Sequence, residues 1–154
     1  MERLFQARQW AEKGYHHALN KEHDSAIEAN AKAIALDPNY APACNNRGLA
    51  YDNKGQYDRA IEDFNKAIAL NPNYAQAYTN RGIAYGKKGQ NDRAIEDYNK
   101  AIALDPNYAA AYNNRGIAYY MKGNMGRAIS DLQKACDMGN EIGCKALKMT
   151  LEKR

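Results

Sequence analysis

Three cysteines and three histidines are the side chains of this 154-residue chain best suited to nucleophilic, redox or metal chemistry. Cysteines that act together often lie at short spacings such as CxxC, whereas Cys44, Cys136 and Cys144 do not. Cys136 occupies a position that Ile68 and Ile102 fill elsewhere in the chain. We therefore predict buried, reduced thiols, with a disulfide or a metal site as the less favoured alternative.

The histidines are poorly placed for a shared metal ion. His16 and His17 are neighbours, which point about 100° apart on a helix, and His23 falls in or beyond the next turn. The chain also lacks a Ser-His-Asp arrangement, a phosphate-binding loop and clustered carboxylates in a credible pocket. We predict no metal, no cofactor and no catalytic activity, so the protein is not expected to be an enzyme.

These side chains are carried by a repeated element. Pro38, Pro72 and Pro106 are spaced by 34 residues, and each lies in the phrase IALDPNY or IALNPNY. Alignment on this spacing gives four copies, which cover residues 7–40, 41–74, 75–108 and 109–139. A period of this length is typical of repeat arrays, in which each unit buries its apolar face against its neighbours.

The copies resemble the tetratricopeptide repeat, whose pattern is an aromatic, Gly, Tyr, Ala, an aromatic, Ala and Pro at fixed offsets. The third copy supplies the whole pattern as Tyr78, Gly82, Tyr85, Ala94, Tyr98, Ala101 and Pro106. Other copies depart from it, with Cys44 at the first aromatic, His17 at the tyrosine and Asn140 at the last proline. The resemblance implies an all-α, right-handed α-solenoid of helix-turn-helix repeats, forming a single domain over residues 1–154.

Apolar residues at helical spacing flank an internal glycine in the later copies, which predicts a helical hairpin. A left-handed conformation that ends the first helix costs a residue with a Cβ about 1–2 kcal/mol. The glycines expected there are Gly55, Gly89 and Gly123. A second glycine lies inside the first helix and is expected to mark close approach of the partner helix, with small Ala60, Ala94 and Ala128 facing it. These inner glycines are Gly48, Gly82 and Gly116.

A charged pair recurs in three copies but not in the first. An arginine replaces the leucine that the family usually has before its first glycine, at Arg47, Arg81 and Arg115. The same copies carry an aspartate in the second helix, at Asp63, Asp97 and Asp131. The first copy has Lys13 and Ala29 instead. This joint presence and absence predicts an Arg–Asp ion pair within each copy, whereas solvated charges copied by duplication are the alternative.

The two ends of the array differ. Residues 140–154 interleave apolar and charged side chains, which predicts an amphipathic capping helix that covers the last repeat. At the other end Leu4 and Phe5 could extend the first helix, but no separate cap is visible. An exposed apolar edge there would favour self-association.

The family resemblance also implies a concave groove, lined by the first helix of each repeat, in which an extended peptide usually binds. Mapped onto this chain, the peptide-binding groove consists of Tyr15, Asn45, Asn46, Leu49, Asn53, Thr79, Asn80, Ile83, Lys87, Asn113, Asn114, Ile117, Tyr120 and Met121. Arg8 and Leu19 would add to it from the first repeat.

Asn46, Asn80 and Asn114 recur at one position of this groove. Asparagine offers a donor and an acceptor, so a ladder of asparagines could bind peptide backbone with little regard for sequence. A similar ladder holds protein substrates in the family's glycosyltransferase members. Bonds to neighbouring helices, or recurrence by duplication, are the alternative.

Family members that bind the acidic C-terminus of chaperones use a Lys, Asn, Asn, Lys, Arg set. The basic residues are missing from the matching positions here, so chaperone-tail capture is disfavoured. Leu49, Ile83 and Ile117 favour a ligand with some apolar side chains instead.

Composition excludes few classes of partner. The net charge of +4 is spread along the chain, which gives no specific indication of nucleic-acid binding. No run approaches transmembrane length, and MERLFQARQW lacks the apolar core of a signal peptide. We therefore expect no membrane partner and a cytoplasmic location.

The leading functional expectation is a non-catalytic protein-interaction scaffold that binds a peptide segment or a partner helix in the groove. Its protein or peptide partner is not specified by the fold. A structural self-assembling or oligomerising module, and the substrate-holding part of a larger enzyme, are the alternatives.

Overall fold

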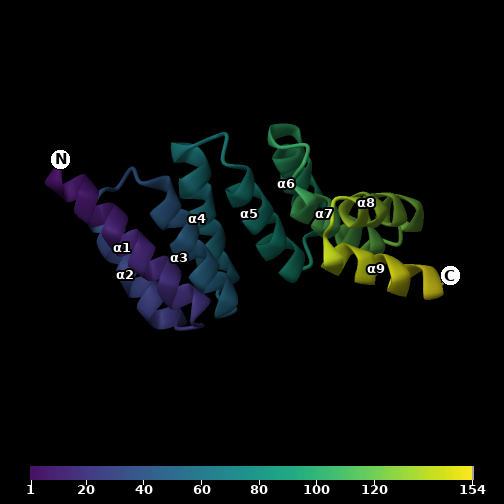
Figure 1. Cartoon of the computed structure of the whole chain (residues 1–154), viewed down its shortest axis with the longest axis horizontal. Coiled ribbons are helices and arrows are strands. Elements are labelled where there is room, and N and C mark those ends of the chain that lie inside the picture. The colour runs from purple at the N-terminus through teal and green to yellow at the C-terminus, as the bar shows by residue number, and fades with distance from the viewer. Residues whose placement is uncertain (154) are drawn as a thin grey trace. The chain divides into compact units, whose positions relative to one another are not determined.

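The computed structural model describes residues 1–153, and this range forms nine helices and no strand (Figure 1). In chain order they are α1 (Glu2–Leu19), α2 (His23–Leu36), α3 (Ala41–Asn53), α4 (Tyr57–Leu70), α5 (Ala75–Lys87), α6 (Asn91–Leu104), α7 (Ala109–Met121), α8 (Met125–Asp137) and α9 (Glu141–Glu152). The all-α class, the repeated helical hairpins of the α-solenoid class and the helix after the last hairpin are as predicted.

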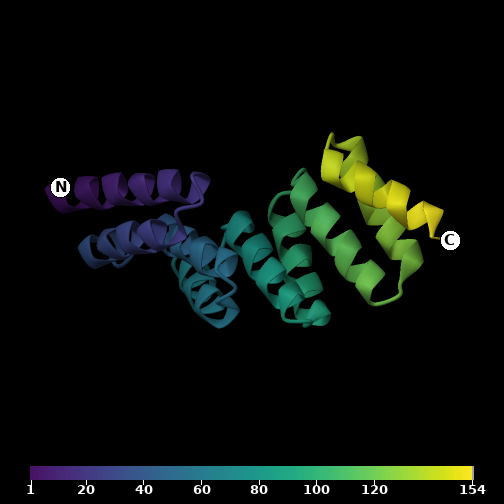
Figure 2. The same ribbon diagram turned by 90° about the horizontal axis from the view of Figure 1, so that it is seen from below.

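The chain divides into two compact units, Met1–Asn80 and Arg81–Arg154, with the boundary inside α5. In the first unit α1 packs on α2, and α3 packs on α4 (Figure 1). In the second unit α7 packs on α8, and α9 packs on both (Figure 2). Leu4 and Phe5 extend α1, as predicted, and both are exposed.

Small side chains dominate the core of each unit. In the first unit Ala11, Ala33 and Ala43 form one buried cluster beneath Trp10. In the second unit Ala94 and Ala118 are buried together with the Tyr98 ring. Alanine brings the helix backbones close together, and such tightly packed interiors respond to the addition of single methyl groups.

The glycines inside the first helices mark close approach of the partner helix, as predicted. A Cβ added at Gly82 would lie 2.6 Å from a ring carbon of Tyr98, and one added at Gly48 would lie 2.7 Å from the Phe64 ring. The backbone carbonyl of Ala128 lies 3.2 Å from a Cβ added at Gly116, in agreement with the predicted approach of that alanine, while the atoms nearest to a Cβ added at Gly82 belong to the ring of Tyr98. The glycine therefore makes room for an aromatic side chain of the second helix.

The turns also follow the sequence. Gly55, Gly89 and Gly123 have φ of 76°, 76° and 77°, which confirms the left-handed conformation expected after the first helix. In the first hairpin Lys21 takes a left-handed φ of 61°, without the freedom of glycine. α2, α4 and α6 end at an extended Asp or Asn before proline, whereas α8 ends at Met138. At Asp105 the carboxylate accepts a hydrogen bond from the backbone of Asn107 at 3.1 Å.

Candidate interaction surface

An ion pair fixes the first helix of a hairpin against the second. Arg81 Nε donates to Asp97 Oδ2 at 2.9 Å, and its Nη2 donates to Oδ1 at 2.7 Å. The same bidentate contact joins Arg47 to Asp63 and Arg115 to Asp131. The predicted pairs are therefore confirmed. Each pair therefore joins the two helices of its hairpin by two hydrogen bonds.

Burial and charge act in opposite directions within these pairs. Burial raises the pKa of Asp97, while the hydrogen bond and charge of Arg81 lower it. The hydrogen bond to Asp131 raises the pKa of Arg115. The carboxylates are almost buried, with only 7% of the Asp97 side chain exposed, so both partners are charged groups held largely away from water.

The predicted groove residues of the first unit divide into buried and accessible ones. Asn45, Thr79 and Asn80 are buried, and Asn80 Nδ2 donates to Asn45 Oδ1 at 3.0 Å. This is a bond between neighbouring first helices, α3 and α5, as in the alternative interpretation of the asparagines. Asn46 and Leu49 are half-buried, whereas Tyr15 and Asn53 are exposed. Arg8 and Leu19, also on α1, are exposed as well.

The second unit contains a cavity of about 260 Å³ between α5 and α7, referred to below as the α5–α7 cavity. Five predicted residues line it, namely Ile83, Lys87, Asn114, Ile117 and Met121. Asn113, another predicted residue of α7, is buried, and its Oδ1 has no hydrogen-bond partner among the described residues.

Sequence reasoning missed that Tyr98 of α6 also lines the α5–α7 cavity. Its ring lies against Gly82 and is largely buried. Gly82 is the sequence feature that could have indicated this. Because glycine has no side chain, the Tyr98 ring lies directly against α5 at this position.

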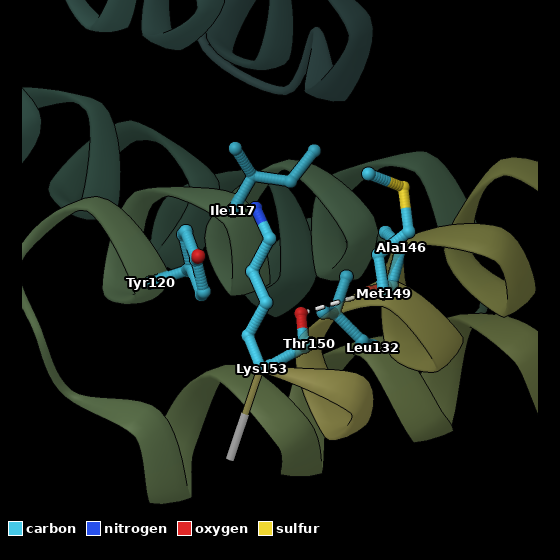
Figure 3. A pocket seen from close by; sticks show the side chains of 7 residues that line it. All are labelled: Ile117, Tyr120, Leu132, Ala146, Met149, Thr150 and Lys153. Atoms are coloured by element: carbon cyan, nitrogen blue, oxygen red, sulfur yellow. Dashed lines mark hydrogen bonds between the residues drawn. The ribbon is translucent and has the colours of Figure 1, made fainter.

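A second cavity, of about 150 Å³, lies between α7 and α9 and is referred to below as the α7–α9 cavity (Figure 3). Two predicted residues, Ile117 and Tyr120, line it together with Leu132 of α8. The other lining residues come from the C-terminal segment and were not predicted: Ala146, Met149, Thr150 and Lys153. Thr150 is satisfied within α9, because its Oγ1 donates to the carbonyl of Ala146 at 2.8 Å.

The prediction of three reduced thiols is wrong for two of them. Cys136 and Cys144 form a disulfide, with their Cα atoms 4.5 Å apart. The reason is the tight turn between α8 and α9, which brings residues eight positions apart in sequence face to face. Cys44 is free and buried, as predicted, and burial raises the pKa of its thiol.

Among residues 1–153 no group of three His, Cys, Asp or Glu side chains is arranged to hold a metal ion. His17 contacts the carboxylate of Glu22, and His23 is the first residue of α2. Within the same residues no helix combines the length and apolar character needed to cross a bilayer.

Family models match most of the repeated region. Those described as tetratricopeptide repeat match residues 41–74, 64–96 and 109–142, and one described as TPR repeat matches residues 84–123. No curated protein matches the sequence.

Solved structures agree with the family models. A crystal structure of MamA is 32% identical, with a TM-score of 0.78, and the match covers 88% of this chain and 79% of MamA. The first TPR domain of human RPAP3 is 30% identical over 77% of this chain and 93% of that domain, with a TM-score of 0.75. PilF of Pseudomonas aeruginosa has a TM-score of 0.90 at 17% identity, covering 99% of this chain and 71% of its own, which shows a shared fold.

The first TPR domain of Spaghetti (RPAP3) is solved bound to the HSP90 peptide SRMEEVD. It is 29% identical to this chain, with a TM-score of 0.75, and the match covers 78% of this chain and 95% of that domain.

Proposed function

Because this chain belongs to the tetratricopeptide-repeat family, we propose that it is a non-catalytic interaction scaffold that binds a peptide segment or helix of a partner protein. The α5–α7 cavity is the observation that carries the proposal. It brings together five of the residues that the family pattern assigns to ligand contact. The HSP90 peptide bound by the similar RPAP3 domain supports the class of ligand.

The chemistry of the α5–α7 cavity favours a ligand with an apolar anchor. Ile83, Ile117 and Met121 supply apolar surface, while the side-chain amide of Asn114 can donate to and accept from a peptide bond. The volume of about 260 Å³ suits one large side chain. We therefore assign Asn114 to the peptide backbone and the surrounding apolar residues to an aliphatic or aromatic side chain.

Packing in the first unit reduces the number of asparagines in the predicted ladder that can contact a ligand. The amide of Asn80 is already bonded to Asn45, and both side chains are buried. A ligand that contacts Asn80 would have to break this hydrogen bond. Breaking a buried hydrogen bond costs more free energy than breaking one between exposed groups. The half-buried Asn46 and Asn114 are the better candidates for contact with a peptide.

Selection from a random peptide library displayed on phage tests this proposal. The groove variant carries Asn114→Ala with Met121→Glu, and a matched variant carries Glu96→Ala with Lys100→Ala on the exposed face of α6. Peptides should bind the unchanged chain and the α6 variant but not the groove variant. Equal binding to all three, with unchanged helicity and melting, would remove the α5–α7 cavity from the proposal.

Self-association is a second candidate function, and it rests on α1. Leu4, Phe5 and Leu19 are 50%, 61% and 61% exposed, which leaves apolar side chains at both ends of that helix. Sedimentation of the unchanged chain beside a Leu4→Glu, Phe5→Glu variant checks it. A mass that rises with concentration only in the unchanged chain supports assembly through α1, whereas a constant monomer mass argues against it.

The cytoplasmic location stays a prediction, and the Cys136–Cys144 disulfide bears on it. Disulfides persist in oxidising compartments and are rare in the cytosol, so the bond favours an oxidising environment. Rapid acid quenching of cells followed by thiol alkylation measures the state of the two cysteines. Two alkylated thiols would agree with the cytoplasm, and protected cysteines with an oxidising compartment.

A further inference from the structure

We propose that the α7–α9 cavity is a second subsite of the interaction surface, which takes one apolar side chain of a bound peptide whose neighbouring residue is acidic. The Cys136–Cys144 disulfide holds α9 where it completes this subsite. The inference rests on the proposed function, because it extends the same peptide-binding surface beyond α7.

The lining and size of the cavity define the first part of the ligand. Ile117, Leu132 and Met149 present aliphatic surface, and the only hydroxyl from α9, that of Thr150, is already bonded to Ala146. An apolar cavity of about 150 Å³ is large enough to hold benzene. The α7–α9 cavity has that volume, so it can accommodate a phenylalanine, leucine or methionine side chain.

Charge defines the second part. Lys153 extends from the end of α9 toward Ile117 at the edge of the cavity (Figure 3). No carboxylate is among the residues that line this cavity within residues 1–153. An ammonium group beside an apolar cavity suits a ligand with a carboxylate next to its apolar side chain.

Continuity favours an internal peptide segment over a chain end. Ile117 lines both the α7–α9 cavity and the α5–α7 cavity. A peptide bound along this surface therefore passes one cavity and continues to the other. The carboxylate is then that of an aspartate or glutamate side chain within the segment.

The disulfide supplies the support that this subsite needs. Four of its seven lining residues belong to the segment from Ala146 to Lys153, which begins two residues after Cys144. The bond ties the start of α9 to the end of α8, whose Leu132 lies in the cavity. Loss of the bond would let α9 move away from α7 and open the cavity.

Blocked dipeptides test the subsite on the full chain by amide chemical shifts in nuclear magnetic resonance. Acetyl-Phe-Asp-amide should shift the amides of Ile117, Thr150 and Lys153, while acetyl-Ala-Asp-amide should not. Acetyl-Phe-Asn-amide should bind about threefold more weakly, because an exposed ion pair contributes about 0.2–1 kcal/mol. Acetyl-Phe with a free carboxylate tests the chain end, and tighter binding of this probe would overturn the internal segment.

Variants separate the parts of the inference. Lys153→Met should remove the preference for Asp over Asn, whereas Lys145→Met, an exposed change on α9 outside the cavity lining, should not. Ala146→Phe should fill the cavity and abolish the shifts. Met149→Glu, at a position 58% exposed, tests the same point without added bulk in the core. Shifts that are absent, or unchanged in both cavity variants, would overturn the subsite.

A double Cys136→Ser, Cys144→Ser variant tests the disulfide. It should weaken binding of acetyl-Phe-Asp-amide several-fold while α7 and α8 keep their helicity, and unchanged affinity would overturn the positioning role. The Asn114→Ala, Met121→Glu groove variant leaves most of the α7–α9 lining intact. Dipeptide binding in that variant therefore reports on this subsite even if the phage selection fails.

Discussion

Replacing Arg81 by methionine should destabilise the protein mainly through the charge that it leaves behind. Both oxygens of Asp97 accept hydrogen bonds from Arg81, at 2.9 and 2.7 Å. Removing one member of a buried pair costs about 3–5 kcal/mol. The guanidinium side is 20% exposed against 7% for the carboxylate, so water compensates part of the loss. We expect a loss of about 2–3 kcal/mol at neutral pH.

The first repeat provides the matched control. It carries Lys13 and Ala29 where Arg81 and Asp97 stand in the third. The double variant Arg81→Lys, Asp97→Ala copies that arrangement and leaves no buried carboxylate. It should lose only about 1 kcal/mol, because the remaining cost is a small cavity and not an unpaired charge.

The cost of Arg81→Met should depend on pH. Burial raises the pKa of Asp97 even with Arg81 present, and without Arg81 this pKa rises further. A carboxyl group whose pKa is higher in the folded state binds its proton more readily in that state. It therefore stabilises the folded protein below the unfolded pKa, and this stabilisation is lost as pH rises through the folded pKa. The variant should therefore approach the unchanged chain in stability as pH falls to about 4.

Urea unfolding, followed by far-ultraviolet circular dichroism, measures the stability of the unchanged chain, the Arg81→Met variant and the double variant at neutral pH and at about pH 4. Comparing each variant with the unchanged chain at the same pH removes acid effects that they share. A cost for Arg81→Met that is the same at both pH values, or no larger than that of the double variant, would refute the buried-charge argument.

Three further predictions concern the backbone and the disulfide. Gly82→Ala should lower the free energy of unfolding by at least about 2 kcal/mol, because the new methyl group overlaps the Tyr98 ring. Gly126→Ala on α8, with open space around it, should raise the free energy of unfolding by up to about 1 kcal/mol. Thermal melting measures both variants, and equal effects would contradict the close-approach argument. Lys21→Gly should raise the free energy of unfolding by about 0.5–1 kcal/mol, since it relieves a left-handed φ of 61° at some cost in unfolded-chain entropy, and a loss of stability in urea would oppose this reasoning. Reducing Cys136–Cys144 should lower stability by about 2–3 kcal/mol, as measured by melting with and without a dithiol, while Cys44→Ser serves as the background for both samples.

Features with a local physical cause could be predicted from the sequence. The sequence predicts that Gly55 and the equivalent glycines of the later repeats end the first helix with a positive φ, and each has a positive φ in the structure. The Arg–Asp pairs could be predicted because the first repeat lacks both partners at once. Joint absence is evidence of contact that recurrence alone does not provide.

The remaining features depend on packing between elements. An asparagine that recurs in each repeat can face a ligand or, like Asn80, bond to a neighbouring helix, and the sequence pattern is identical in the two cases. The Cys136–Cys144 bond depends on how α9 folds back on α8, and spacing rules for metal or redox motifs do not describe that turn. For the same reason the contribution of Met149 and Lys153 to a cavity could not be predicted from their place in a capping helix.

The Arg–Asp pairs and the Asn80–Asn45 hydrogen bond differ in what they connect. Each Arg–Asp pair closes within one hairpin, across 16 residues, whereas the Asn80–Asn45 bond joins one hairpin to the next, across 35 residues. A hairpin gained or lost by duplication therefore keeps its own ion pair, while the amide bond is remade only if a neighbour follows. Asn113, the counterpart of Asn45 in the last repeat, has a buried oxygen without a partner among the described residues. The residue 35 positions after Asn113 is Lys148 of α9, so the helix that follows the last repeat has no amide at the place from which Asn80 donates to Asn45.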